Sequence, residues 1–499
     1  MHFASNFIGL AMKMKNTFTT LFLGLAFHIS LGQGKPEWAA TFDQINKEVT
    51  KNSKAYQTLG DASKKIGHRL TGSENGKKAE QYAFDLLKSY GFDDVRFQPF
   101  TAESWSRGTL EVLIGEENNN MLPFKAVTLA HSPVSSQVEA EIVDMGNGVE
   151  ADYLSNPGKA KDMIVLAFLG VLPGSPEGTK SLHRSEKTAL AIKYGAKGII
   201  LINAAPGGIL LTGTASVTGK LIPIPAVCIG REDGLELKQA LEEHPEFASI
   251  KMTNTSGMIT ARNVIASIKG SKYPEEKVVV GGHLDSWDLA TGAIDNGIGS
   301  FAVIDIARTI KKLKLQPERT LEFVLFMGEE EGLLGSKAYV EQAIADGSID
   351  QVKYMLNYDM TNDPKGFSSS MEGSKALFSY IGSQVQKIDA SFKNGFRFGV
   401  GLHSDHQPFM LQGIPTGGGS DGHLEQSVLN CYHADCDTFD LVDKAGMTNT
   451  VRYSSMLAFA LADAPEIPVR RQTDAEVKEM LIRNNLEEPL RISGDWRWK

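Results

Sequence analysis

The chain has 499 residues, of which 42% are hydrophobic and 22% are charged, and its formal net charge is −9 at pH 7. This length exceeds that of one ordinary domain, so two or three domains with well-buried cores are expected. The acidic balance, without a dense stripe of lysine and arginine, argues against a nucleic-acid partner.

Residues 1–34 have the charge and hydropathy order of a secretory signal peptide. Lys13 and Lys15 precede the apolar run "FTTLFLGLAFHISLG", after which the sequence becomes polar. The run is shorter than the roughly 20 residues that a membrane-spanning helix needs. The pattern therefore predicts export to a secreted or periplasmic location, without a stable membrane span.

Three cysteines are too few for a scaffold held together by disulfides. Cys431 and Cys436 could close a small loop around His433, or they could be free or buried thiols. A separation of five positions does not decide between these alternatives.

Residues 35–123 are predicted to form helices followed by an edge strand. The segment "NGKKAEQYAFDLLKSYGF" places Tyr82, Leu86 and Leu87 at helical spacing, and Gly91 is a stop signal. Residues 124–253 differ, because they contain short β runs such as "KDMIVLAFLG" and "AKGIILINA", with one helix through "SEKTALAIKYGA". We interpret this segment as a separate, β-rich insert.

From residue 254 onward, strand and helix signals alternate. Apolar runs such as "KVVVGGHLDS", "TLEFVLFMGEEEG" and "KYMLNYDM" are separated by helices predicted at 297–313, after Gly335 and at about 373–387. This alternation predicts an α/β fold of three layers, αβα, with a central, mostly parallel mixed sheet. Residues 35–123 and 254–499 would form this domain. A ligand crevice is expected outside the carboxyl ends of its strands.

Charged side chains gather at those strand ends. They are His283 and Asp285 after the first run, Asp295 on the loop between that run and its helix, Glu329 and Glu330 after the second run, Asp359 after the third, and His433 in "CYHADCDTFD". Each alone could be a solvated loop residue or a helix cap. Together, like charges in one crevice repel one another unless a cation neutralises them. Carboxylates with two imidazoles and no thiolate suit zinc, cobalt or manganese, with two ions sharing one carboxylate.

The motifs "HLDSWD…GAIDNG", "GEEEGLLGS", "NYDM" and "YHADCDT", in that order, resemble the zinc exopeptidase family of leucyl aminopeptidases and glutamate carboxypeptidases. The resemblance runs from about Gly67 in "GHRLTGS" to Asp443. It implies the zinc-exopeptidase fold, and the insert is similar to a protease-associated domain that borders the cleft. It also suggests a homodimer.

The resemblance implies two Zn²⁺ ions per chain, for which Co²⁺ or Mn²⁺ could substitute. It makes Asp295 the bridging carboxylate and assigns the remaining ligands as His283 and Asp359 for one ion, and Glu330 and His433 for the other. Asp285 would orient the imidazole of His283 from behind. One departure is Asn296, where relatives often have a second aspartate, so the role of that acid is open here.

The mechanism that this implies is hydrolysis by a water held between two zinc ions roughly 3.5 to 4 Å apart. Glu329 would be the general base that takes the water's proton and passes it to the leaving amine. His406, in "SDHQPF", is a candidate hydrogen-bond donor to the tetrahedral intermediate, and Trp287 is a candidate wall of the substrate pocket. A polar surface loop and simple packing are the alternatives for these two residues.

The predicted function is a secreted zinc-dependent exopeptidase that acts on dipeptides or short peptides with a free N-terminus. A catalytically inactive, receptor-like binding protein on the same fold is one alternative, and the complete ligand set argues against it. A one-zinc glutaminyl cyclase is another, and both the two-metal set and the insert argue against it.

Overall fold

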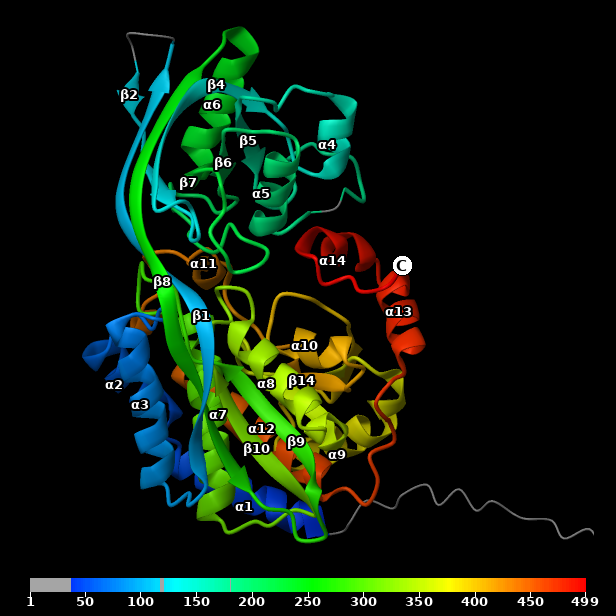
Figure 1. Ribbon diagram of the computed structural model, residues 1–499. Coiled ribbons are helices and arrows are strands. Elements are labelled where there is room, and N and C mark those ends of the chain that lie inside the picture. Colours follow the sequence, from blue (N-terminus) through cyan, green and yellow to red (C-terminus); the bar gives the residue numbers. More distant parts are fainter. Residues whose placement is uncertain (1–36, 117–120, 180) are drawn as a thin grey trace, which may run out of the picture. The chain divides into compact units, whose positions relative to one another are not determined.

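The computed structural model describes residues 37–116, 121–179 and 181–499 (Figure 1). The predicted signal peptide lies outside the described residues. Among those residues, no helix combines the length and the apolar character that crossing a membrane requires.

A mixed sheet forms the centre of the larger part of the chain, in the order β13-β12-β14-β11-β9-β10-β8. The bounds of these strands are β8 Phe247–Ile268, β9 Tyr273–His283, β10 Arg319–Phe326, β11 Val352–Asn357, β12 Gly366–Ser369, β13 Gly395–Phe398 and β14 Thr416–Ser420. The four central strands, β14, β11, β9 and β10, run parallel, whereas β8 and β12 pair antiparallel with their neighbours β10 and β14. The predicted mostly parallel sheet is confirmed.

Helices cover both faces of this sheet. The first face carries α1 Glu37–Asn52, α2 Ala55–Lys65, α3 Glu74–Ser89, α7 Ile298–Lys312, α9 Lys375–Ile388 and α12 Lys444–Asp463; the second carries α8 Leu334–Ala345 and α10 His406–Leu411. Side chains along β9 alternate between the two cores: Val278 and Val280 lie in the first, and Val279 lies in the second. Burial on both faces explains why the strand sequences are continuous apolar runs rather than alternating ones.

Two long antiparallel strands connect this sheet to the insert. β1 Val95–Gly115 pairs with β8 along almost its whole length. At its N-terminal end it is the edge strand next to β8, whose other side pairs with β10. The other end of β8 pairs with β4 Ser135–Asp144 of the insert, so β8 runs through the predicted boundary at residues 253 and 254 (Figure 1).

The insert continues the sheet as β4-β5-β6-β7-β3. These strands are β3 Ala126–Thr128, β4 Ser135–Asp144, β5 Ile164–Phe168, β6 Gly198–Ile202 and β7 Ala226–Ile229, with helices α4 Glu150–Ser155, α5 Arg184–Lys193 and α6 Arg231–Glu243. The sequence predicted α5 but not α4 or α6. In α6 only Gly234 and Leu237 are buried, so its apolar periodicity is weak.

Two C-terminal helices were not predicted either. They are α13 Asp474–Arg483 and α14 Glu487–Ser493, and α14 packs against α5 of the insert.

Candidate metal centre

The ends of three neighbouring strands bring the predicted site residues to one edge of the sheet. In the parallel register of β9 and β10, Phe326 lies opposite His283, and in that of β9 and β11, Asn357 lies opposite Gly281. The turns that follow these strands therefore emerge together. They carry the glutamate pair Glu329 and Glu330 after β10, and Asp359 after β11.

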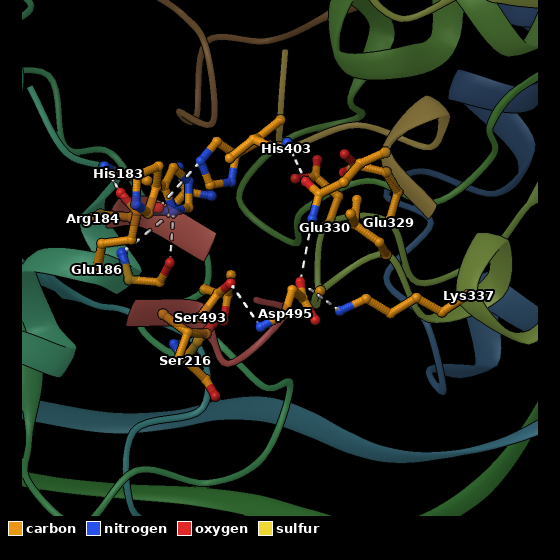
Figure 2. A pocket seen from close by; sticks show the side chains of 18 of the residues that line it. His183, Arg184, Glu186, Ser216, Glu329, Glu330, Lys337, His403, Ser493 and Asp495 are labelled. Atoms are coloured by element: carbon orange, nitrogen blue, oxygen red, sulfur yellow. Dashed lines mark hydrogen bonds and ion pairs between the residues drawn. The ribbon is translucent and has the colours of Figure 1, made fainter. Parts of the chain in front are cut away.

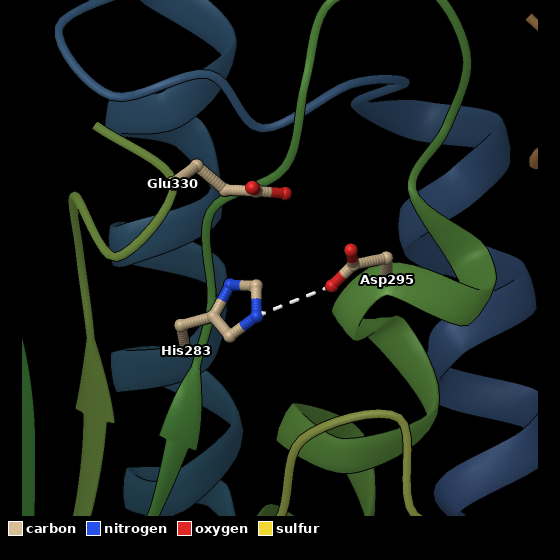
Figure 3. A group of neighbouring side chains, drawn as sticks. All are labelled: His283, Asp295 and Glu330. Atoms are coloured by element: carbon tan, nitrogen blue, oxygen red, sulfur yellow. Dashed lines mark ion pairs between the residues drawn. The ribbon is translucent and has the colours of Figure 1, made fainter. Parts of the chain in front are cut away.

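Asp295 lies between two imidazoles, and each of its carboxylate oxygens faces a different one (Figure 3 shows the first). Its Oδ1 is 3.3 Å from His283 Nε2, and its Oδ2 is 2.9 Å from His433 Nε2. Each imidazole nitrogen also faces a second carboxylate: Asp359 Oδ1 at 3.4 Å from His283, and Glu330 Oε2 at 3.0 Å from His433. The structure thus brings together all five predicted ligands, as two groups that share Asp295.

The donor atoms fit a divalent metal. Ligand atoms of His283, Asp295 and Glu330 lie within 4.8 Å of one another, and so do those of His283, Glu329 and Asp359. Glu330 Oε1 and His283 Nδ1 are buried without a hydrogen-bond partner. Buried carboxylates that repel one another need a compensating cation, and nitrogen with oxygen donors and no thiolate suits zinc.

Electrostatics at the centre are dominated by burial and by the crowding of acids. Burial raises the pKa of Glu329 well above its usual range, and although the charge of His283 opposes this, Asp359 and Glu330 add to it. Burial would lower the pKa of His283, yet the carboxylates of Glu329 and Asp359 raise it well above its usual value. The site therefore concentrates negative charge in a place that water screens poorly.

Asp285 supports the turn that carries the two glutamates. It accepts hydrogen bonds from the backbone N–H groups of Glu329 and Glu330, both at 3.3 Å. The predicted contact is longer, because its Oδ1 is 3.6 Å from Nδ1 of His283, beyond ordinary hydrogen-bond length. In this structure Asp285 fixes the turn after β10 more directly than it fixes the imidazole.

Asp437 was not predicted, although it lies in the quoted motif "YHADCDT". It accepts hydrogen bonds from the N–H groups of Ile294 at 2.7 Å and Asp295 at 3.0 Å. Burial raises its pKa to about 7, and these two bonds oppose that shift. Asp437 thus holds the backbone on which the shared carboxylate sits.

Asn296, the departure from the family pattern, has a backbone-binding role here. Its Nδ2 donates to the carbonyl of Tyr358 at 2.9 Å, and its Oδ1 accepts from the N–H of Met360 at 3.0 Å. The side chain is fully buried. It therefore connects the loop that carries Asp295 to the segment that carries Asp359.

Comparison with known families identifies this arrangement. Residues 263–458 match the model of peptidase family M28, and residues 138–237 match the model of the PA domain. The chain carries a peptidase family M28 domain. The family consists of di-zinc metallopeptidases, so the predicted class of enzyme is confirmed, together with the predicted protease-associated insert.

Three similar proteins support this conclusion. Carboxypeptidase Q from Xenopus laevis is 26% identical over 434 residues, which cover 83% of this chain and 87% of that protein. The solved peptidase M28 precursor from Shewanella amazonensis SB2B has a TM-score of 0.73 at 24% identity, covering 87% of this chain and 99% of that one. A zinc aminopeptidase from Bacillus subtilis has a TM-score of 0.61 at 22% identity, covering 83% and 97%. The two structures show that the fold is shared.

A cleft opens beside the metal centre between three parts of the chain (Figure 2). The M28 domain lines it with Glu329, Glu330, Lys337, His403, Tyr432 and His433; the PA domain with His183, Arg184, Glu186 and Ser216; and the C-terminal segment with Ser493 and Asp495. The volume of the cleft, including the part that is open to solvent, is about 710 Å³. Contributions from the PA domain and from the C-terminal segment were not predicted residue by residue.

The two predicted substrate-binding residues lie in different surroundings. Trp287 is 4% exposed, lies edge-on to the ring of His433 and borders a small cavity with Asp295 and Glu330. His406 begins α10, and its Nε2 is 3.1 Å from the carbonyl oxygen of Gly401. In the described structure it is His403, three residues earlier, that lines the cleft. The role of His406 as a hydrogen-bond donor stays a prediction.

The segment that carries His433 is closed by a disulfide. Cys431 and Cys436 are bonded, with their Cα atoms 5.2 Å apart, which answers the question that their spacing left open. The PA domain holds the same segment, because the N–H of Thr212 donates to the carbonyl of His433 at 2.9 Å. The imidazole of His433, a predicted metal ligand, is thus positioned by a covalent loop and by the insert.

Arg69, in "GHRLTGS", holds the loop that leads from His283 to Asp295. Its guanidinium donates to the carbonyls of Leu284 at 2.6 Å, Thr291 at 2.6 Å and Gly292 at 2.8 Å, and the residue is fully buried. We expect Arg69→Met to lower the free energy of unfolding by about 3 kcal/mol, since three buried carbonyls lose their donors. Urea unfolding of the metal-free protein measures this change.

The matched control is Arg470→Met, the same replacement at an exposed arginine that pairs with Glu476. We expect it to leave stability nearly unchanged, because exposed ion pairs contribute little. Equal stability of the Arg69 and Arg470 variants would show that Arg69 does not support this loop.

Proposed function

We propose that the protein is a secreted, zinc-dependent exopeptidase that hydrolyses dipeptides or short peptides next to a free N-terminus. The observation that carries the proposal is the position of Asp295, whose two oxygens face His283 Nε2 and His433 Nε2 separately. A carboxylate placed in this way is suited to bridge two cations. The order of charge and hydropathy in residues 1–34 supports the export.

In this proposal, Asp295 would hold both ions, with His283 and Asp359 as the further ligands of one, and Glu330 and His433 as those of the other. Bound zinc supplies a polarised scissile carbonyl and a water that is acidic enough to ionise near neutral pH. The side chains of Asp285, Asp437 and Asn296 hydrogen-bond to the backbone of the segments that carry these ligands, and so hold the ligands in position.

Glu329 is the proposed general base. It lines the cleft, its Oε2 is 4.0 Å from His283 Nε2, and its backbone is fixed by Asp285. Its carboxylate takes the proton of the attacking water and then delivers it to the nitrogen of the leaving amine. Glu330, the next residue, faces His433 instead, so the two neighbours have separate tasks.

Two features of the cleft, together with the names of two relatives, favour an exopeptidase. The PA domain and the C-terminal segment wall it, which restricts access to the middle of a long chain. Its walls include the carboxylates of Glu329 and Glu330, which favour the ammonium group of a free N-terminus, whereas Glu186 and Asp495 face His403 and Lys337. The relatives named above include an aminopeptidase and a carboxypeptidase, and both names describe removal of terminal residues.

Acetylation of the substrate's N-terminus tests this proposal. We expect kcat/KM for an N-acetyl dipeptide to be lower than that for the free dipeptide by on the order of 10², since a charged contact in a desolvated site is lost. Both peptides are assayed with the same zinc-loaded enzyme, and released amino acids are quantified.

Equal rates on the two peptides, or internal cleavage of a denatured protein, would contradict the exopeptidase specificity. Bound metal without any release of amino acids would favour a non-catalytic binding protein. Cyclisation of an N-terminal glutamine would favour a glutaminyl cyclase.

We also propose that the protein is a homodimer. Analytical sedimentation of the same preparation tests this.

A further inference from the structure

The disulfide between Cys431 and Cys436 closes a loop of the metal centre whose covalent closure the mechanism above does not use. His433, the predicted ligand of one ion, lies inside this loop, and Asp437 follows the loop directly. Asp437 accepts a hydrogen bond from the N–H group of Asp295 at 3.0 Å. One covalent bond therefore constrains both a predicted metal ligand and the residue that supports the shared carboxylate.

The backbone of His433 has an unfavourable conformation that this loop has to maintain. Its φ is 56°, in the left-handed region, which residues with a side chain adopt at a cost in free energy. Such a conformation persists where the surrounding structure imposes it. The disulfide fixes the ends of the loop, and the N–H of Thr212 donates to the carbonyl of His433 at 2.9 Å. After the disulfide opens, noncovalent contacts alone oppose the return of His433 to an ordinary backbone conformation.

The two cysteines of the loop differ in their exposure to solvent. Cys436 is partly exposed, whereas Cys431 is buried. An external thiolate therefore has better access to Cys436, and access is one of the factors that set the rate of thiol–disulfide exchange. The third cysteine of the chain, Cys228, is fully buried in the core of the PA domain, so its thiol cannot exchange with this disulfide. A reductant from outside can thus open the bond without competition from a thiol of the same chain.

We propose that this disulfide is a redox switch for the metal ion that Glu330 and His433 would hold. A dithiol reductant forms a mixed disulfide with Cys436 and releases the thiolate of Cys431. The second thiol of the reductant then closes the reductant's own disulfide and releases Cys436, so two electrons and two protons pass from the dithiol to the protein. The open loop lets His433 leave its left-handed conformation, and the affinity for this ion falls. The inference rests on the two-metal site of the proposed function.

The affinity for the other ion should respond less to reduction. Its proposed ligands His283 and Asp359 lie at the ends of β9 and β11, and neither belongs to the disulfide loop. The segment before Asp295 also keeps the hydrogen bonds that Arg69 donates to the carbonyls of Thr291 and Gly292. Reduction should therefore weaken the binding of one ion of the pair, which a general loss of folding would not do.

Zinc titration of two single-ion variants tests this selectivity, with affinity rather than turnover as the readout. Asp359→Ala keeps the ligands of the ion at His433, and Glu330→Gln keeps those of the ion at His283. Each metal-free variant is either reduced with dithiothreitol or left oxidised, then desalted and treated with iodoacetamide, so that no free thiolate of the loop binds zinc. We expect reduction to raise the zinc Kd of Asp359→Ala at least about tenfold and that of Glu330→Gln less than about threefold. In the wild type, reduction should weaken the binding of one of the two ions.

A double variant with Cys431→Ser and Cys436→Ser removes the bond without adding a bulky group. We expect it to bind zinc as the reduced wild type does. The matched control is Cys228→Ala, which removes the cysteine outside the loop and keeps the disulfide. Reduction should weaken zinc binding by this control as it does in the wild type. Re-oxidation of reduced wild type that has not been treated with iodoacetamide should restore the original affinity.

Equal zinc affinities of oxidised and reduced Asp359→Ala would overturn the inference, and so would an equal rise of Kd in Asp359→Ala and Glu330→Gln. A loss of affinity that re-oxidation does not restore would also overturn it. Circular dichroism is recorded for each form, because unfolding of the reduced protein or of the double serine variant would make the disulfide a requirement for folding rather than a switch. All these outcomes leave the proposed function standing. A wild type that binds one zinc ion per chain, or that releases no amino acids from dipeptides, would instead contradict the proposed function on which the inference rests.

Discussion

Glu329→Gln is expected to lower kcat by about 10²- to 10⁴-fold, the usual contribution of a general base, and to leave the metal content near that of the wild type. An amide cannot accept the proton of the attacking water, although it has nearly the same shape as the carboxylate. The fold should be unaffected, because the backbone N–H of Glu329, rather than its side chain, makes the bond to Asp285.

This experiment also separates two roles that the geometry offers to Glu329. Its carboxylate lies near His283 and Asp359 in a grouping that could itself hold a metal. Metal analysis beside a peptidase assay distinguishes the roles, with Glu330→Gln as the matched control at the next residue. We expect the control to lose metal as well as activity, since Glu330 faces His433 at 3.0 Å. Substantial activity in Glu329→Gln would remove it from the base role, and lost metal would make it a ligand.

The sequence predicted those parts of the site that follow from strand order. Once β9, β10 and β11 are recognised as buried parallel strands, His283, Glu330 and Asp359 must emerge at one edge, because side chains that follow parallel strands share that edge. The periodicity of the strands and helices is a local property, and it reads directly from the residues. The layers and the helix α7 were predictable for the same reason.

Residues that act through long-range contacts could not be predicted in this way. Arg69 bonds to Leu284, which lies 215 positions later, and Thr212 of the PA domain contacts His433, 221 positions later. Which residue of a loop faces the cleft was equally hidden, because the motif "GLHSDHQPF" does not show that His403 lines it while His406 starts a helix. Such contacts depend on how separate elements pack, and no sequence period encodes them.

Arg184 illustrates the same limit for function. In the sequence it is one basic residue before a predicted helix, which is ordinarily a solvated position. Only the packing of the PA domain and the C-terminal helix α14 around the cleft makes it a buried cation. Local sequence therefore did not show that this side chain would line the cleft.

Asp295→Ala is expected to remove both metal ions together and to abolish activity. The wild-type protein should bind two divalent ions per chain at saturation, and Asp295 places one oxygen 3.3 Å from His283 Nε2 and the other 2.9 Å from His433 Nε2. Loss of this carboxylate removes a ligand from each ion and leaves His283, Glu330 and their neighbours with fewer donors than zinc requires. Elemental analysis of the purified, zinc-saturated variant, beside a peptidase assay, measures both effects.

Asp359→Ala is the matched control, because Asp359 faces His283 alone among the two imidazoles. We expect this variant to lose one ion and to keep the other, with its fold intact by circular dichroism. A shared carboxylate requires this difference between the two variants. If the two metal sites shared no ligand, each substitution would remove one ion at most. The bridged pair would be contradicted if the wild type bound one ion per chain and Asp295→Ala retained it. The other ligands would then hold that ion without Asp295.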